Sequence, residues 1–206
     1  MRLRPTTART AAVLLAFAAL AGCGPSEGTT EGKRNTGMNM QQGADRADAI
    51  LQETLAAVEP RLRWNHEASA QSGCTDSLNK ATGTGSVDRA ILILTIVSEQ
   101  RRGALLGVIE RDWKARGYKI TSVRSNPVAP AIYASTPEDY SLAVEVGGQG
   151  QFRLSAATPC LTDSGVQEPT AKPNTPVRTT PYPQRPDVHD EFWSAATPAP
   201  AATPTP

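Results

Sequence analysis

Three observations predict an α+β fold, with a small, mostly antiparallel sheet of four or five strands packed against two helices. Two segments repeat apolar residues at helical spacing, one long segment is apolar on both faces, and two segments alternate around a glycine-rich turn. All of these patterns fall within residues 44–162 of the 206-residue chain. Apart from an apolar run at 11–20, the flanking segments have little apolar content, so we expect one domain with an extension at each end.

The two helices are predicted from apolar stripes. The first begins at Ala44 and ends near Glu59, because Pro60 cannot continue a helix. Ser98 is the expected N-cap of the second helix, and Gly117 is its expected stop. Its buried stripe is expected to be Leu105, Leu106, Ile109 and Trp113.

The longest strand is predicted at Ala90–Val97, where the sequence AILILTIV is rich in β-branched residues and apolar on both faces. We expect it at the centre of the sheet. Shorter strands are expected at residues 61–65 and 118–123. Residues 83–86 (GTGS) lack the ending of a phosphate-binding loop and are expected to form a flexible connector.

A hairpin is predicted from strands at residues 140–146 and 152–156. Its register depends on the turn, and a three-residue loop at 148–150 keeps apolar residues opposite apolar ones. A two-residue loop would mix the faces. The expected cross-strand pairs are Val144–Leu154 and Val146–Phe152, with Glu145–Arg153 on the other face.

Residues 1–22 have the layout of a signal peptide. Three arginines and no acidic residue precede an apolar run at 11–20, which is too short to span a bilayer stably. The run ends in Leu20-Ala21-Gly22-Cys23, which resembles the lipobox of bacterial lipoproteins. The alternative is an ordinary signal peptide followed by an incidental cysteine.

The resemblance implies that Cys23 receives a diacylglycerol and that cleavage occurs just before it. Two acyl chains anchor a protein stably, so the mature chain is expected on the extracytoplasmic face of the cell membrane. The flanks rich in Ala, Thr, Pro and Arg resemble lipoproteins of actinobacteria. This resemblance covers about the first 25 residues and carries no functional residue into the domain.

Residues 23–43 are predicted to be a lipid-anchored flexible tether, because they are rich in Gly, Thr, Asn and Gln. Beyond the domain, residues 163–206 hold ten of the 17 prolines and are predicted to be a Pro/Thr-rich disordered tail. The cluster Phe192-Trp193 interrupts this tail. It is interpreted either as a few hydrophobic residues in a disordered segment or as a short docking motif for a partner.

The chain has three cysteines, an odd number for a secreted protein. If Cys23 carries lipid, Cys74 and Cys160 remain, and we expect them to form a disulfide in an oxidising compartment. Two buried free thiols are the alternative.

Removal of residues 1–22 takes three of the 21 basic residues and none of the 20 acidic ones, which leaves a formal net charge of −2. This near-neutral charge gives no support to nucleic-acid binding. His66-Glu67 begins like a zinc-protease motif, but Ala70 stands where the second histidine is needed. We therefore expect no metal and no cofactor, and the sequence identifies no catalytic residue.

Two functions remain, and the sequence leaves open whether the chain is an enzyme. The first is a binding or structural module of the cell envelope, held to the membrane through Cys23 and in contact with an envelope protein or a cell-wall component. The alternative is a small envelope hydrolase or accessory enzyme whose carboxylates converge only in the fold. Its candidates are Asp76, Asp88, Glu99, Glu110, Asp112, Glu138 and Asp139.

Overall fold

The computed structural model describes residues 37–176 and 185–200. The chain separates into two units, and all of these residues lie in the second unit, which spans Asn35–Pro206. The predicted signal peptide and Cys23 lie outside the described residues. The elements are α1 (Met40–Ala56), β1 (Trp64–His66), β2 (Ala70–Thr75), β3 (Ala81–Ile93), α2 (Glu99–Ala115), β4 (Lys119–Arg124), β5 (Ala131–Ser135), β6 (Ser141–Val146), β7 (Phe152–Ala157) and β8 (Leu161–Thr162).

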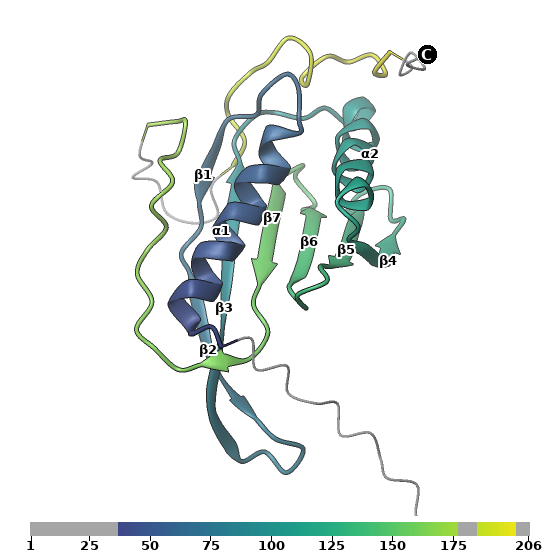
Figure 1. The fold of residues 1–206 in the computed structure, drawn as a ribbon. Helices are drawn as coiled ribbons and strands as arrows, with labels where there is room; N and C mark the ends of the chain where they lie inside the picture. The colour runs from purple at the N-terminus through teal and green to yellow at the C-terminus, as the bar shows by residue number, and fades with distance from the viewer. Residues whose placement is uncertain (1–36, 177–184, 201–206) are drawn as a thin grey trace, which may run out of the picture. The chain divides into compact units, whose positions relative to one another are not determined.

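The eight strands form one sheet in the order β1-β3-β7-β6-β5-β4, with β2 and β8 also paired to β3. Every pairing between these strands is antiparallel. Both helices pack on the same face of this sheet, and no helix of the described residues covers the other face (Figure 1). The α+β class is therefore confirmed, whereas the expected count of four or five strands is wrong.

The additional strands arise because β3 starts well before its apolar run, although it ends at Ile93 and not at the predicted Val97. It begins at Ala81, so the predicted connector at 83–86 is strand, and β2 pairs with it as a hairpin. Gly85 of β3 packs against Met40, the first residue of α1, and a Cβ at Gly85 would come within 2.6 Å of Met40 Sδ. The glycine thus permits a close approach within a strand. Because β3 pairs with β1, β2, β7 and β8, it is the most connected strand of the sheet.

The main core lies between the helices and the covered face. Ile91 and Ile93 of β3 pack there with α1 and α2, and the predicted stripe of α2 is buried as expected. Trp113 of α2 is fully buried, and its indole Nε1 donates a hydrogen bond to Thr54 Oγ1 of α1 at 3.0 Å. This bond satisfies a polar group that would otherwise be costly to bury.

The start of α1 corrects the predicted tether. Asn39 Oδ1 accepts a hydrogen bond from the Gln42 backbone, and Gln42 Oε1 accepts one from the Asn39 backbone. This reciprocal capping box starts the helix at Met40, so residues 40–43 are helical instead of tether. Composition did not reveal this boundary because its signal is the Asn39–Gln42 spacing.

The predicted hairpin register is confirmed. The pairs Val144–Leu154, Glu145–Arg153 and Val146–Phe152 form between β6 and β7. The loop at 148–150 closes with Gly150 at φ +82, a conformation that favours glycine. Local alternation and turn chemistry were sufficient to predict this hairpin.

Cys74 and Cys160 form a disulfide. Cys74 lies on β2 and Cys160 just before β8, so the bond ties the β2–β3 hairpin to the end of β7. Gly73 pairs with Gly85 beside this bond, and β2 changes register there.

The prediction of a disordered tail is wrong for residues 163–176 and 185–200. The first segment runs along the edge formed by α1 and β1 (Figure 1), where Trp64 N donates to Asn174 Oδ1 at 2.9 Å. The second segment buries Trp193 in the main core, and its Val188 bridges to Thr95. The prediction used only the apolar content of the tail itself. It could not include the edge of the domain that the tail covers, because that edge forms only when the chain folds.

Candidate functional site

The uncovered face of the sheet holds the main candidate site, a pocket of about 560 Å³. This volume lies within the range of small-molecule binding sites. The pocket forms where β3 and β7 run beside the turn between β1 and β2. It is lined by His66, Glu67, Ala68, Ala70, Asp88, Leu92 and Arg153.

Strand alternation brings the charged residues of the pocket together. Asp88 and Leu92 point to the uncovered face, whereas Arg89 and Ile91 between them point to the helices. Arg153 comes from the neighbouring strand, where Leu92 is its direct pairing partner. Glu67 follows β1, and its backbone N–H donates to Ala90 O at 2.9 Å, which holds it beside β3.

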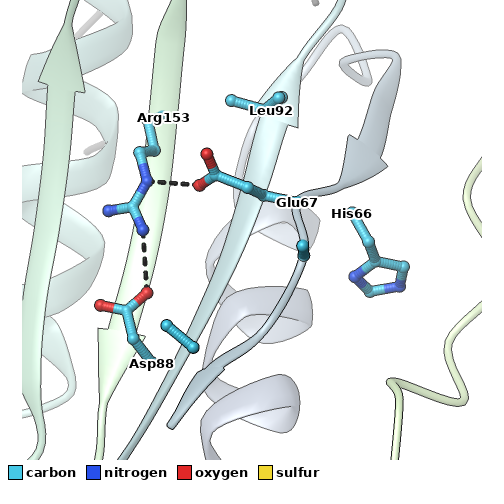
Figure 2. Close-up of a pocket in the computed structure, with 7 residues that line it drawn as sticks. His66, Glu67, Asp88, Leu92 and Arg153 are labelled. Atoms are coloured by element: carbon cyan, nitrogen blue, oxygen red, sulfur yellow. Dashed lines mark hydrogen bonds and ion pairs between the residues drawn. The ribbon is translucent and has the colours of Figure 1, made fainter. Parts of the chain in front are cut away.

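The guanidinium of Arg153 lies between two carboxylates (Figure 2). Its Nε donates to Glu67 Oε2 at 2.6 Å, and its Nη2 donates to Asp88 Oδ1 at 2.8 Å. Burial lowers the pKa of Arg153, but the bond to Glu67 and the charge of Asp88 outweigh it, so that the pKa is raised. The three side chains hold one another in place, and the site presents both donors and acceptors in a fixed arrangement.

The polar surface continues across the uncovered face. Glu145 pairs with Arg153 in the β6–β7 register and accepts a hydrogen bond from the Tyr133 hydroxyl at 2.7 Å. This bond raises the pKa of Tyr133. Arg124 of the edge strand donates to the same hydroxyl at 3.2 Å. Charged and polar side chains therefore extend from the pocket to the far edge of the sheet.

His66 lines the pocket, but its ring points away from Arg153 (Figure 2). The ring Nε2 lies 2.7 Å from Ala171 O in the segment that covers the edge of the domain. His66 also packs edge-on against Trp64, with 5.0 Å between the ring centroids. Through these contacts His66 helps to hold the 163–176 segment on the domain, and neither contact involves the charged groups of the pocket.

The structure brings only one of the seven carboxylates named for the enzyme alternative into this pocket. That residue is Asp88, and it is paired with Arg153. Glu99, Glu110 and Asp112 lie along α2, where each pairs with a cation in the same helix or at its C-cap. Asp76, Glu138 and Asp139 lie in turns. The described residues therefore contain no convergent set of these seven.

A buried cation lies directly behind the pocket, on the helix side of β3. Arg89 is 1% exposed and donates to Ser69 Oγ and to Gln167 O. Its Nε lies 3.3 Å from Asp48 Oδ2 of α1. Desolvation raises the pKa of Asp48, although the charge of Arg89 opposes that effect. Arg89 thus joins α1, the β1–β2 turn and the 163–176 segment behind the pocket.

Sequence reasoning predicted Arg153 on the outer face of its hairpin, but it missed Glu67 and Asp88 as its partners. It also missed Arg89. Adjacent residues in a strand point to opposite faces, so one of Asp88 and Arg89 must face the core. The predicted strand began at Ala90, however, so this signal became available only with the finding that β3 begins at Ala81. The pairing with Glu67 joins residues 86 positions apart, and no local pattern reports it.

Phe192-Trp193 docks on its own chain. Trp193 is 1% exposed, and its indole Nε1 donates to Pro60 O at 2.7 Å. The Arg101 guanidinium lies 4.4 Å from the centroid of the Phe192 ring. Ser98, the expected N-cap of α2, makes no side-chain capping bond and instead donates through Oγ to Ala195 O at 2.6 Å. The cluster therefore packs within its own chain, which neither interpretation predicted: it is not part of a disordered segment, and its contacts are not with a separate partner.

Together, the fold and the site define an α+β domain with one covered and one uncovered sheet face and a charged pocket on the uncovered face. No family model matches the chain, and no curated protein matches it. A crystal structure of a DUF4853 family protein from Actinomyces odontolyticus is similar over 69% of this chain and 78% of that chain. Its sequence identity is 10% and its TM-score is 0.37.

Two further features bear on membranes and metals. No helix in the part of the chain that the structure describes is long and apolar enough to cross a membrane. The same residues contain no group of three or more His, Cys, Asp or Glu side chains placed to hold a metal ion.

Proposed function

We propose that the chain is a lipid-anchored binding module of the bacterial cell envelope, held through Cys23 on the extracytoplasmic face of the membrane. The observation that carries the binding role is the pocket on the uncovered sheet face. Its guanidinium and two carboxylates are already in place, so that binding would require little side-chain ordering. The lipobox-like sequence supports the anchored location.

The pocket suits a small polar ligand or a polar segment of an envelope component. Glu67 and Asp88 each use one carboxylate oxygen on Arg153 and keep the other as an acceptor. Leu92, Ala68 and Ala70 supply an apolar wall. Ligands that offer both hydrogen-bond donors and an apolar edge match this lining, as do sugars and short peptides.

The alternative is a small hydrolase or accessory enzyme that uses carboxylates. The Glu67–Arg153–Asp88 arrangement is the one place where two carboxylates of the pocket converge. Because the guanidinium binds both, neither is positioned alone as a general base. The arrangement therefore favours recognition over proton transfer.

Site-specific photocrosslinking in the native host tests the binding role. A photoreactive amino acid at Ala68, an exposed residue of the pocket wall, is expected to capture an envelope component. The matched control is Gly103, an exposed position of α2 where an added side chain would meet open space, and it should capture nothing in common with Ala68. Loss of the Ala68 adduct in an Arg153→Ala variant would support the pocket as the site. Identical adducts from both positions, or turnover of a cell-wall substrate by the purified chain, would contradict the proposal.

A further inference from the structure

The β2–β3 hairpin extends beyond the end of the sheet, past β8 (Figure 1). Residues 75–83 are all exposed, and the turn at their centre carries Leu78, which is 71% exposed. The other large exposed hydrophobic residues of the described chain are less exposed: Ile96 at 38%, Val123 at 53% and Val128 at 59%. Leu78 is therefore the most exposed large apolar side chain among the described residues, and it lies at the tip of a projection.

The tip is rigidly built. Asp76 Oδ1 accepts hydrogen bonds from the backbone N–H groups of Leu78 and Lys80 at 2.8 and 2.9 Å. The Asp76 backbone N–H donates to Lys80 O, and the disulfide of Cys74 fastens the hairpin near its base. The carboxylate is thus engaged within the turn, while the side chains of Leu78 and Lys80 are exposed.

The base of this hairpin is also where the described chain begins. Asn39 bridges to Thr162 of β8, and Thr162 pairs with Thr84 of β3. Fifteen residues separate Asn39 from Cys23. As the predicted tether, they would span roughly 22 Å, whereas the hairpin projects roughly 15 Å past Thr84. An anchor at Cys23 therefore keeps a membrane surface within reach of the hairpin tip.

We infer that the β2–β3 hairpin tip contacts the lipid bilayer, with Leu78 entering the interface and Lys80 lying against anionic headgroups. This inference rests on the proposed lipid anchor. A single leucine and a single lysine bind a membrane weakly, but a short tether gives an effective concentration in the millimolar range. The contact orients the sheet, so that its opposite end and the C-terminal segment point away from the bilayer.

Brominated lipids test this contact on the full lipid-modified chain reconstituted in vesicles of phosphatidylcholine and phosphatidylglycerol. The three native tryptophans are at most 6% exposed, so an added surface tryptophan can be distinguished from them. The probe is Leu78→Trp, and the matched control is Val128→Trp in the β4–β5 turn at the opposite end of the sheet. We expect bromine quenching of the Leu78→Trp variant to exceed that of the control roughly twofold or more. Adding Lys80→Glu should reduce the excess on anionic vesicles and leave it unchanged on neutral ones.

Vesicle flotation separates the proposed lipid anchor at Cys23 from the inferred contact of the hairpin tip with the bilayer. Flotation with equal quenching of both variants would overturn the hairpin contact and leave the anchor standing. A blue-shifted Leu78→Trp emission without bromine quenching would place the tip against protein, such as a second copy, and would also overturn it. Failure of the full chain to float would contradict the proposed anchor, and the inference would fall with it.

Discussion

Arg153 links the two carboxylates of the pocket, and the strength of this link can be measured. A double-mutant cycle with Arg153→Ala and Glu67→Ala should give a coupling energy of about 1 kcal/mol by urea unfolding. The value is modest because 32% of the Arg153 side chain is exposed and solvent screens the pair. The coupling should fall as salt is raised. Strictly additive variants would show that the bond does not hold the pocket in place.

Asp48 should give the stability of the domain a distinct pH dependence. Burial raises its pKa above the ordinary value, so the folded protein binds the proton more tightly than the unfolded chain does. The stabilisation from Asp48 is complete at pH values below the pKa that Asp48 has in the unfolded chain. It is lost as the pH rises through the pKa that Asp48 has in the folded protein. Relative to Asp48→Asn, the wild-type free energy of unfolding should therefore fall as the pH rises above the ordinary range of an aspartate pKa. A relative rise would mean that the attraction to Arg89 exceeds the cost of burial.

Among the elements, the register of the β6–β7 hairpin was predictable, whereas the β2–β3 hairpin was not. The first has strict alternation and a glycine at a left-handed turn position, so local chemistry specifies it. The second contains Gly73, Gly83 and Gly85, which lower strand propensity and resemble a connector. Its pairing is supported by the disulfide and by the packing of Met40 on Gly85, both of which depend on the tertiary fold.

The disulfide should make a large contribution to stability. Cys74 and Cys160 are 86 residues apart, and closing a loop of that size contributes about 4 to 5 kcal/mol in the chain-entropy model. The Cys74→Ser/Cys160→Ser double variant should lose most of this free energy of unfolding in urea. Reductant should destabilise the wild type and leave the double variant unchanged. Equal stability of the two proteins would support the alternative of free thiols.

At the scale of the whole molecule, the C-terminal segment completes the core. Its composition indicated a tail, because proline cannot donate in a sheet and the segment is poor in apolar residues. Trp193 bonds to residues more than 90 positions away: its indole donates to Pro60 O, and its carbonyl accepts from Ser98 N. A sequence window cannot show such contacts, so the docking of the segment follows only from the fold.

Trp193→Ala should therefore destabilise the domain strongly, by about 3 to 5 kcal/mol, the usual cost of removing a buried tryptophan. Val128→Ala, at a position that is 59% exposed, is the matched control and should change stability by less than about 0.5 kcal/mol. Urea unfolding followed by circular dichroism measures both. Similar small effects would show that the segment lies on the surface without stabilising the domain.

The proposed location rests on Cys23, and metabolic labelling with an alkyne fatty acid tests it most directly. The wild-type chain expressed in an actinobacterial host should incorporate the label and partition with membranes. Cys23→Ala should lose both the label and the membrane association, whereas Cys74→Ser/Cys160→Ser should keep them. Persistent labelling of the Cys23→Ala variant, or an unlabelled wild-type chain in the culture medium, would contradict the account of an anchored binding module.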